Sequence, residues 1–174
     1  MKKIVVVNGY PNSGKTEFEL FVAKHIPSTI YSSIDPAKDY AKRYFGWNGE
    51  KTEEWRRFLS ELKKFLVEEF DLIFNEVNNR INTFYISKNE IIMIDSREPK
   101  EIDRFKKTFK AITVFIKNDR VEKITSNNSD ANVENYTYDY VIDNNGTLEE
   151  LEQKDWSSDV CSSDLAINFI KELN

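Results

Sequence analysis

The sequence predicts an α/β fold: a three-layer α/β/α sandwich around a five-stranded, mainly parallel sheet. Short apolar runs rich in β-branched residues alternate along the chain with stretches of helical periodicity. The first run leads through a glycine-containing loop directly into a helix. Strands that alternate with helices pair in parallel, because each crossover helix packs on a face of the sheet. Ligands of such sheets bind at the carboxyl ends of the strands.

Five buried strands are expected, at residues 3–8, 29–34, 90–94, 111–116 and 138–142. The first helix has one buried face, with residues spaced at i, i+3, i+4, i+7 and i+8: Phe18, Phe21, Val22, His25 and Ile26. This spacing places His25, the only histidine, on the buried face. There a core or boundary role is favoured over a catalytic one.

Three more helical regions are predicted between the strands. Pro36 suits the first turn of a helix with Asp35 as its N-cap, and the apolar stripe of this helix is Ala37, Tyr40, Ala41, Tyr44 and Phe45. One longer region keeps helical spacing from Thr52 through Phe84, and Pro99 starts another helix. Residues 117–137 form a polar stretch longer than most loops, which predicts a functional flap.

Length and composition limit the possible functions. The chain has 174 residues, and we assign residues 1–153 to one globular domain. A formal net charge of −5 argues against nonspecific nucleic-acid binding, which needs a basic face. No apolar run is long enough to cross a bilayer, so we expect a cytoplasmic protein, either a monomer or a homodimer. One cysteine excludes an internal disulfide and a cysteine-rich zinc site.

Residues 155–165 differ in composition from the rest of the chain and lack helical or strand periodicity. They interrupt an amphipathic pattern that resumes at residues 166–173, the end of a helix of uncertain origin. The segment resembles an in-frame translation of a common DNA sequencing adapter. We therefore interpret it as an artefact of gene assembly and assign no function to it.

A complete Walker A motif, or P-loop, follows the first strand: Gly9-Tyr10-Pro11-Asn12-Ser13-Gly14-Lys15-Thr16. Its glycines let backbone N–H groups turn inward around phosphate oxygens, and the next helix adds its positive end. We expect ATP to be bound by the loop residues Gly9, Asn12, Ser13 and Gly14 together with Lys15 and Thr16. Lys15 reaches the β- and γ-phosphates, and the Thr16 hydroxyl ligates Mg²⁺.

Acidic and basic residues follow the predicted strands at the same edge of the sheet. Asp95 ends the third strand, as a Walker B acid does, where it can hold the metal or act only as a helix cap. Arg97 supplies a planar fork that can clamp a phosphate, or it pairs with Glu98 on the surface. Asp35 ends the second strand, where its carboxylate can orient an acceptor or accept its proton.

Cations are needed wherever two anionic substrates meet. Arg43, Lys51, Arg56 and Arg57 lie near or on the helices after Asp35, where a second phosphate has to bind, although each alone suits a solvated surface. In the predicted flap, Lys117, Arg120 and Lys123 are the cations that can close over the transferred phosphoryl group.

The order of these features resembles the deoxynucleoside monophosphate kinases of the P-loop nucleoside monophosphate kinase group over most of residues 2–153. Residues 33–38 (Ser-Ile-Asp-Pro-Ala-Lys) look like the family's "ADPLK" element, and residues 45–52 with Arg56 look like its acceptor-side segment. Residues 95–98 are similar to its Asp-x-Arg element, and residues 138–151 to its closing strand, turn and helix. The polar motif at residues 128–130 lacks a histidine often found there, and Lys117 stands where the family commonly has arginine.

The resemblance implies a P-loop NTPase fold and phosphoryl transfer from ATP to a nucleoside or deoxynucleoside 5′-monophosphate. It implies Lys15, Asp35 and Arg97 as catalytic residues, and Asp35, Lys38, Arg43, Lys51, Arg56 and Arg97 as acceptor-binding residues. Lys117 and Arg120 join the ATP site, and Thr16 and Asp95 hold Mg²⁺. Two alternatives remain open: a kinase for another small metabolite such as a coenzyme precursor, and a non-catalytic nucleotide sensor. A GTPase is disfavoured because the Asn-Lys-x-Asp guanine motif is absent.

Overall fold

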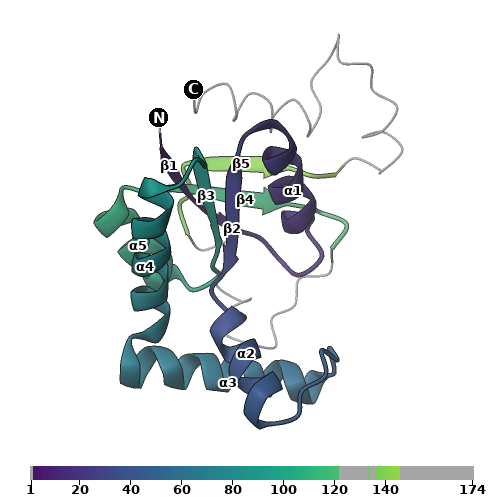
Figure 1. Cartoon of the computed structure of the whole chain (residues 1–174). Coiled ribbons are helices and arrows are strands. Elements are labelled where there is room, and N and C mark those ends of the chain that lie inside the picture. The colour runs from purple at the N-terminus through teal and green to yellow at the C-terminus, as the bar shows by residue number, and fades with distance from the viewer. Residues whose placement is uncertain (1, 122–132, 134–135, 146–174) are drawn as a thin grey trace. The chain divides into compact units, whose positions relative to one another are not determined.

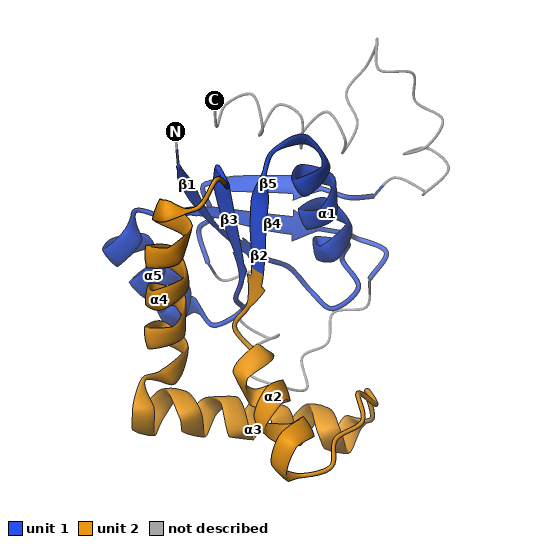
Figure 2. Ribbon diagram, viewed as in Figure 1, with its two compact units in different colours: residues 1–30, 89–174 blue, residues 31–88 orange. Residues whose placement is uncertain are grey.

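The structure is a computed structural model that describes residues 2–121, 133 and 136–145. The chain divides into two compact units, residues 1–30 with 89–174 and residues 31–88 (Figure 2). In chain order the elements are β1 (Lys3–Asn8), α1 (Lys15–His25), β2 (Ser28–Ser32), α2 (Asp35–Tyr44), α3 (Glu53–Phe70), α4 (Leu72–Ile86), β3 (Ile91–Asp95), α5 (Pro99–Phe109), β4 (Ile112–Lys117) and β5 (Tyr140–Asp143) (Figure 1).

The strands form one five-stranded sheet in the order β2-β3-β1-β4-β5. β1 pairs in parallel with β3 and β4, and β4 pairs in parallel with β5. Val7 lies opposite Asp95, and Asn8 lies opposite Phe115. The carboxyl ends of these strands therefore meet at one edge of the sheet, the edge that continues into the P-loop.

Helices cover both faces of this sheet, which confirms the predicted three-layer α/β class. On one face, α1 packs Phe18 and Val22 against buried strand residues that include Val5, Val7 and Met93. Side chains alternate across a strand, so the intervening buried residues of β1 and β3 point to the opposite face. There α5 packs against β1 and β4 with Ile102 and Phe105 buried (Figure 1).

Asp139 ties the start of β4 to the residue before β5. Its carboxylate accepts hydrogen bonds from Thr113 N and Thr113 Oγ1, each at 2.9 Å, and pairs with Lys106. Burial acts to raise the pKa of this carboxyl, but the bonds from Lys106 and Thr113 outweigh it and lower the pKa. Asp139 N also donates to Thr113 Oγ1, so this residue bonds to a side chain, and β5 begins at Tyr140 and not at residue 138 as predicted.

In the second unit, α2, α3 and α4 enclose a separate small core. Ala37 and Ala41 of α2 are fully buried and cluster with Trp47, Leu59 and Leu66. The Thr52 side chain caps α3 by accepting a hydrogen bond from Trp55 N at 3.3 Å. Of the predicted core residues of α4, Val77, Ile81 and Phe84 are buried.

The predicted long helical region is two helices, because Asp71 breaks it. Asp71 adopts the left-handed conformation with φ 51°, which aspartate tolerates better than most residues. Its N–H closes α3 by bonding to Val67 O at 3.0 Å, and α4 starts at the next residue. Helical spacing continues across the break, so periodicity alone misses it.

Three local predictions about the helices are wrong. α2 starts at Asp35 itself, with Ile34 as its N-cap, and the Asp35 carboxylate instead accepts from Ser32 N and Lys38 Nζ. The predicted stripe on α2 is narrower than expected, because Tyr40, Tyr44 and Phe45 are exposed while the two alanines are buried. His25 is exposed at the last turn of α1, where Nδ1 lies 2.8 Å from Phe21 O.

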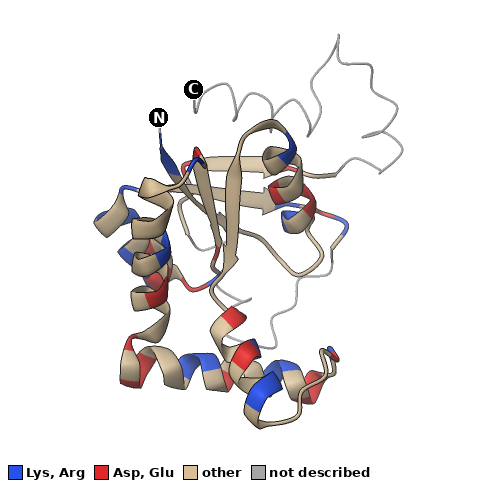
Figure 3. Ribbon diagram, in the orientation of Figure 1, with Lys and Arg blue, Asp and Glu red and all other residues tan. Residues whose placement is uncertain are grey.

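Charged residues of both signs are distributed over α2 and α3 (Figure 3). Within the described part of the chain, no helix combines the length and apolar character needed to cross a membrane.

Candidate functional site

The P-loop forms the turn between β1 and α1, and its backbone is tightly constrained. Gly14 is the N-cap of α1 with φ 92°, and Asn12 has φ 63°. A Cβ added at Gly9 would lie 2.5 Å from Ser13 Oγ and 2.7 Å from Ile116 O, so a larger residue does not fit. α1 begins without a side-chain cap. The backbone N–H groups of its first turn therefore have no side-chain acceptor from the N-cap, and phosphate oxygens commonly bind such groups.

The side chains of the loop fit a phosphate ligand. Lys15 is only 7% exposed, and its Nζ donates to Gly9 O at 2.8 Å and Tyr10 O at 3.0 Å, which holds the ammonium within the loop. Ser13 is 1% exposed, and its hydroxyl has no hydrogen-bond partner among the described residues. A buried hydroxyl without a partner is costly, and a phosphate oxygen would supply that partner.

Sequence patterns did not single out Asn8 and Tyr138, which hold the start of the loop. Asn8 is fully buried, and its Oδ1 accepts from Gly9 N while its Nδ2 donates to Tyr138 Oη, both at 2.7 Å. The Tyr138 hydroxyl donates to Val133 O at 2.8 Å. Its ring stacks on Phe115 with centroids 5.1 Å apart. Burial raises the pKa of Tyr138 well above its ordinary value, so the hydroxyl stays a neutral donor.

The predicted metal ligands lie at the same edge of the sheet. Thr16 is in the first turn of α1, and Asp95 ends β3 in register with Val7, one residue before the end of β1. Among the described residues, no group of three or more His, Cys, Asp or Glu side chains lies together. Mg²⁺ commonly takes one or two protein ligands and fills its shell with phosphate and water oxygens, so this donor set fits it.

Arg97 and the two flap cations differ in their surroundings. Arg97 is half-buried between β3 and α5, in the same unit as the P-loop. Lys117 ends β4, and its Nζ pairs with Asp119 Oδ1 at 3.1 Å. Arg120 is exposed, and its backbone N–H bonds to Asn118 Oδ1. Lys123, residues 128–130 and the segments 146–153, 155–165 and 166–173 lie outside the described residues.

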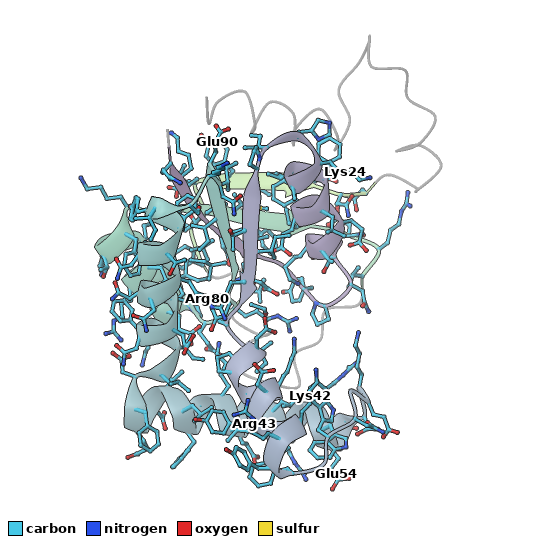
Figure 4. All side chains as sticks on the ribbon, viewed as in Figure 1. Lys24, Lys42, Arg43, Glu54, Arg80 and Glu90 are labelled. Atoms are coloured by element: carbon cyan, nitrogen blue, oxygen red, sulfur yellow. The ribbon has the colours of Figure 1, made fainter. Side chains whose placement is uncertain are left out.

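The second unit contains a pocket of about 360 Å³, within the range of small-molecule sites. It is lined by residues of β2, α2 and α4: Tyr31, Asp35, Pro36, Asp39, Tyr40, Arg43, Tyr44, Leu72, Glu76 and Arg80. Arg43 comes from α2 and Arg80 from α4 (Figure 4). The lining thus combines two guanidinium groups with three carboxylates and three phenols.

Tyr31 is the most deeply buried polar group of this pocket. It is 3% exposed, and its hydroxyl oxygen is buried. The Arg80 guanidinium lies over the ring, 4.1 Å from its centroid, and Arg80 Nε is 3.9 Å from Glu76 Oε2. Burial raises the pKa of Tyr31, and the positive charge of Arg80 offsets part of that rise. The phenol is therefore neutral at ordinary pH.

The structure brings some of the predicted acceptor residues together and leaves others apart. Asp35 and Arg43 both line the pocket, and Lys38 Nζ pairs with Asp35 Oδ1 at 3.0 Å. Lys51 and Arg56 are exposed and do not line it. Sequence analysis missed Tyr31, Glu76 and Arg80. The Glu76–Arg80 spacing of four residues on a helix was the available signal, but such pairs are common on solvated surfaces.

Comparisons with known proteins bear on the fold alone. No protein-family model matches the chain, and a search of curated proteins gives no match. Among solved structures, TT1252 from Thermus thermophilus is similar with a TM-score of 0.50 and 13% identity, over 87% of this chain and 93% of that one. An unliganded sugar kinase from Janibacter sp. HTCC2649 aligns with a TM-score of 0.46 and 16% identity, over 98% and 94%. The first likeness supports a shared α/β fold, and the second is too weak to support an inference.

Proposed function

We propose that this protein is a kinase that transfers the γ-phosphoryl group of ATP to a nucleoside or deoxynucleoside 5′-monophosphate. The observation that carries the proposal is the complete P-loop at the carboxyl end of β1, with Lys15 buried inside it and the Ser13 hydroxyl left without a partner among the described residues. This arrangement suits a triphosphate because it offers backbone donors, a lysine ammonium and a hydroxyl in one turn.

In the proposed reaction, the chain's own groups position and neutralise the transferred phosphoryl group. Lys15 binds the β- and γ-phosphates, and the loop amides hold the triphosphate in line. Thr16 and Asp95 would hold Mg²⁺, which supplies positive charge to the phosphates. Arg97, half-buried after β3 in the same unit as the P-loop, would serve as a bidentate donor to an anionic group.

The pocket of the second unit is the proposed acceptor site. Arg43 and Arg80 provide cations for a monophosphate, and Asp35 can orient the acceptor or receive its proton. The Tyr31 ring, with the Arg80 guanidinium over it, forms part of the wall of the proposed site. Lys38 keeps the Asp35 carboxylate in place through the 3.0 Å ion pair. The roles of Lys51 and Arg56 in acceptor binding stay predictions.

The pocket's charge also supports the alternative of another small acceptor. Asp35, Asp39 and Glu76 are hydrogen-bond acceptors when ionised, and they outnumber the two arginines of the lining. Such a pocket suits a hydroxylated or aminated metabolite as well as a nucleotide. A nucleotide sensor would instead bind ATP without acceptor-stimulated turnover.

A panel of acceptors tests the proposal. Release of ADP from Mg²⁺ and ATP is measured with and without each common nucleoside and deoxynucleoside monophosphate. We expect at least one of them to raise the rate tenfold or more, equivalent to about 1.4 kcal/mol of barrier. Lys15→Ala should abolish the stimulated rate without unfolding the protein. Lys24→Ala, at the exposed end of the same helix, is the matched control and should retain it. If no monophosphate in the panel raises the rate of ADP release, the proposal is contradicted.

A further inference from the structure

The segment that follows β5 reaches back to the P-loop through one side chain. Asn144 Nδ2 donates to Ser13 O at 2.9 Å, across a sequence separation of 131 residues. Ser13 is the residue before the Gly14 N-cap, so this bond acts on the peptide that joins the loop to α1.

The orientation of that peptide decides where its N–H points. In a trans peptide, the C=O and N–H groups lie on opposite sides of the chain, and the described backbone contains no cis peptide. The amide of Asn144 holds the Ser13 carbonyl on the side of β5. The N–H of Gly14 is therefore turned to the opposite side, as required of a P-loop amide that faces phosphate.

Asn144 is itself well placed to act as a fixed support. Its backbone N–H bonds to Lys117 O at 2.7 Å, which extends the pairing of β5 with β4 by one residue. The contact with the loop is close, since a Cβ added at Gly14 would come within 2.0 Å of Asn144 Nδ2. Gly14 is thus required both by its φ of 92° and by the space that the Asn144 amide occupies.

We propose that Asn144 is a positioning residue for nucleotide binding, which sets the Ser13–Gly14 peptide so that the loop is ready for phosphate before ATP arrives. The proposal rests on phosphate binding by the P-loop but not on the identity of the acceptor. Without the amide, the peptide can rotate and the loop has to be ordered by the ligand, so part of the binding free energy is lost. The expected result is an ATP affinity about tenfold weaker, equivalent to about 1.4 kcal/mol.

The test compares Asn144→Ala with Asn89→Ala in the full chain. Asn89 is the matched control, because its amide also makes a partly buried hydrogen bond in the same unit, to Thr29 Oγ1 at 2.6 Å. Asn89 precedes β3, so it lies at the amino ends of the strands, away from the P-loop. Affinities for Mg²⁺-ATP and for inorganic tripolyphosphate are measured by titration calorimetry. KM for the acceptor and the thermal midpoint without ligand are measured alongside.

We expect Asn144→Ala to weaken both ATP and tripolyphosphate about tenfold, to leave KM for the acceptor within about twofold, and to shift the Gly14 amide resonance in NMR spectra. Asn89→Ala should bind both ligands like the wild type. Unchanged ATP affinity in Asn144→Ala overturns the proposal. The proposal is also overturned if weaker ATP binding comes with a raised KM for the acceptor and a lowered thermal midpoint. That pattern would indicate a general structural role for Asn144. Failure of the proposed function is read separately, from acceptor-stimulated turnover of the wild type.

Discussion

Replacing Tyr138 with phenylalanine should cost the protein about 2 kcal/mol of folding free energy. The variant keeps the ring and its stacking on Phe115, and removes only the hydroxyl. Two buried groups then lose their partner: Asn8 Nδ2, on a residue that is 0% exposed, and Val133 O, on another that is 0% exposed. Leaving one buried polar group unpaired costs about 1–3 kcal/mol. Because the structure around both groups can relax, we expect the total cost to stay near the lower end of this range for two groups, about 2 kcal/mol.

The assay is thermal and urea unfolding of the wild type and the variant. For a chain of this size, about 2 kcal/mol corresponds to a fall of about 4–8 °C in the midpoint. The pKa of Tyr138 is raised by burial, so its hydroxyl stays protonated and the loss should be the same from about pH 6 to pH 9.

Tyr136→Phe is the control, because its hydroxyl bonds to Asp103 Oδ1 at 3.0 Å near the surface and its removal should cost no more than about 0.5 kcal/mol. Equal stability of Tyr138→Phe and Tyr136→Phe would refute the reasoning.

Two further predictions concern Arg97 and Asp139, and a third concerns the sequence of residues 155–165. Arg97→Ala should lower acceptor-dependent turnover far more than ATP affinity. Arg104→Ala, on the exposed face of α5, is the control. An unchanged turnover in Arg97→Ala would show that Arg97 does not act on the acceptor. The pKa of the Asp139 carboxyl is lower in the folded than in the unfolded state, so the ionised carboxylate stabilises the fold at pH values above its unfolded-state pKa of about 3.9. This contribution is lost as the pH falls through the lower folded-state pKa. Asp139→Asn should therefore unfold at lower urea than the wild type at neutral pH and approach it below about pH 4; a difference that persists in acid contradicts this assignment. Recloning from genomic DNA should yield a gene without residues 155–165, and a genomic sequence that encodes them would disprove their adapter origin.

The sheet and the P-loop could be predicted because their signals are local. A β-branched run followed by the Walker A residues fixes strand, loop and helix within residues 3–25, and the observed β1 and α1 match. The same holds for Asp95 at the end of β3. In each case the residue types that form the element also carry its chemistry.

Asp35 and Arg43 of the second-unit pocket were predicted from the sequence, but its other charged and aromatic residues and the supports of the P-loop were not, because they depend on contacts between residues distant in sequence. Tyr31 and Arg80 meet only after α2, α3 and α4 have packed. Asn144 contacts Ser13 although the two are 131 residues apart in sequence. Helical periodicity also hides the break at Asp71, since the apolar spacing continues beyond it. Ala37 and Ala41 are buried while the larger Tyr40 and Tyr44 are exposed, a difference that hydrophobicity alone does not reveal.

The central claim is that the γ-phosphoryl group of ATP moves to a monophosphate acceptor and not to water. The most direct measurement is the fate of the label from γ-³²P-labelled ATP, with Mg²⁺ and an equimolar mixture of nucleoside and deoxynucleoside monophosphates, resolved by chromatography. We predict that the label appears in a nucleoside diphosphate, and that Lys15→Ala forms none. Label found only in inorganic phosphate, or left in ATP at every acceptor concentration, would contradict the account.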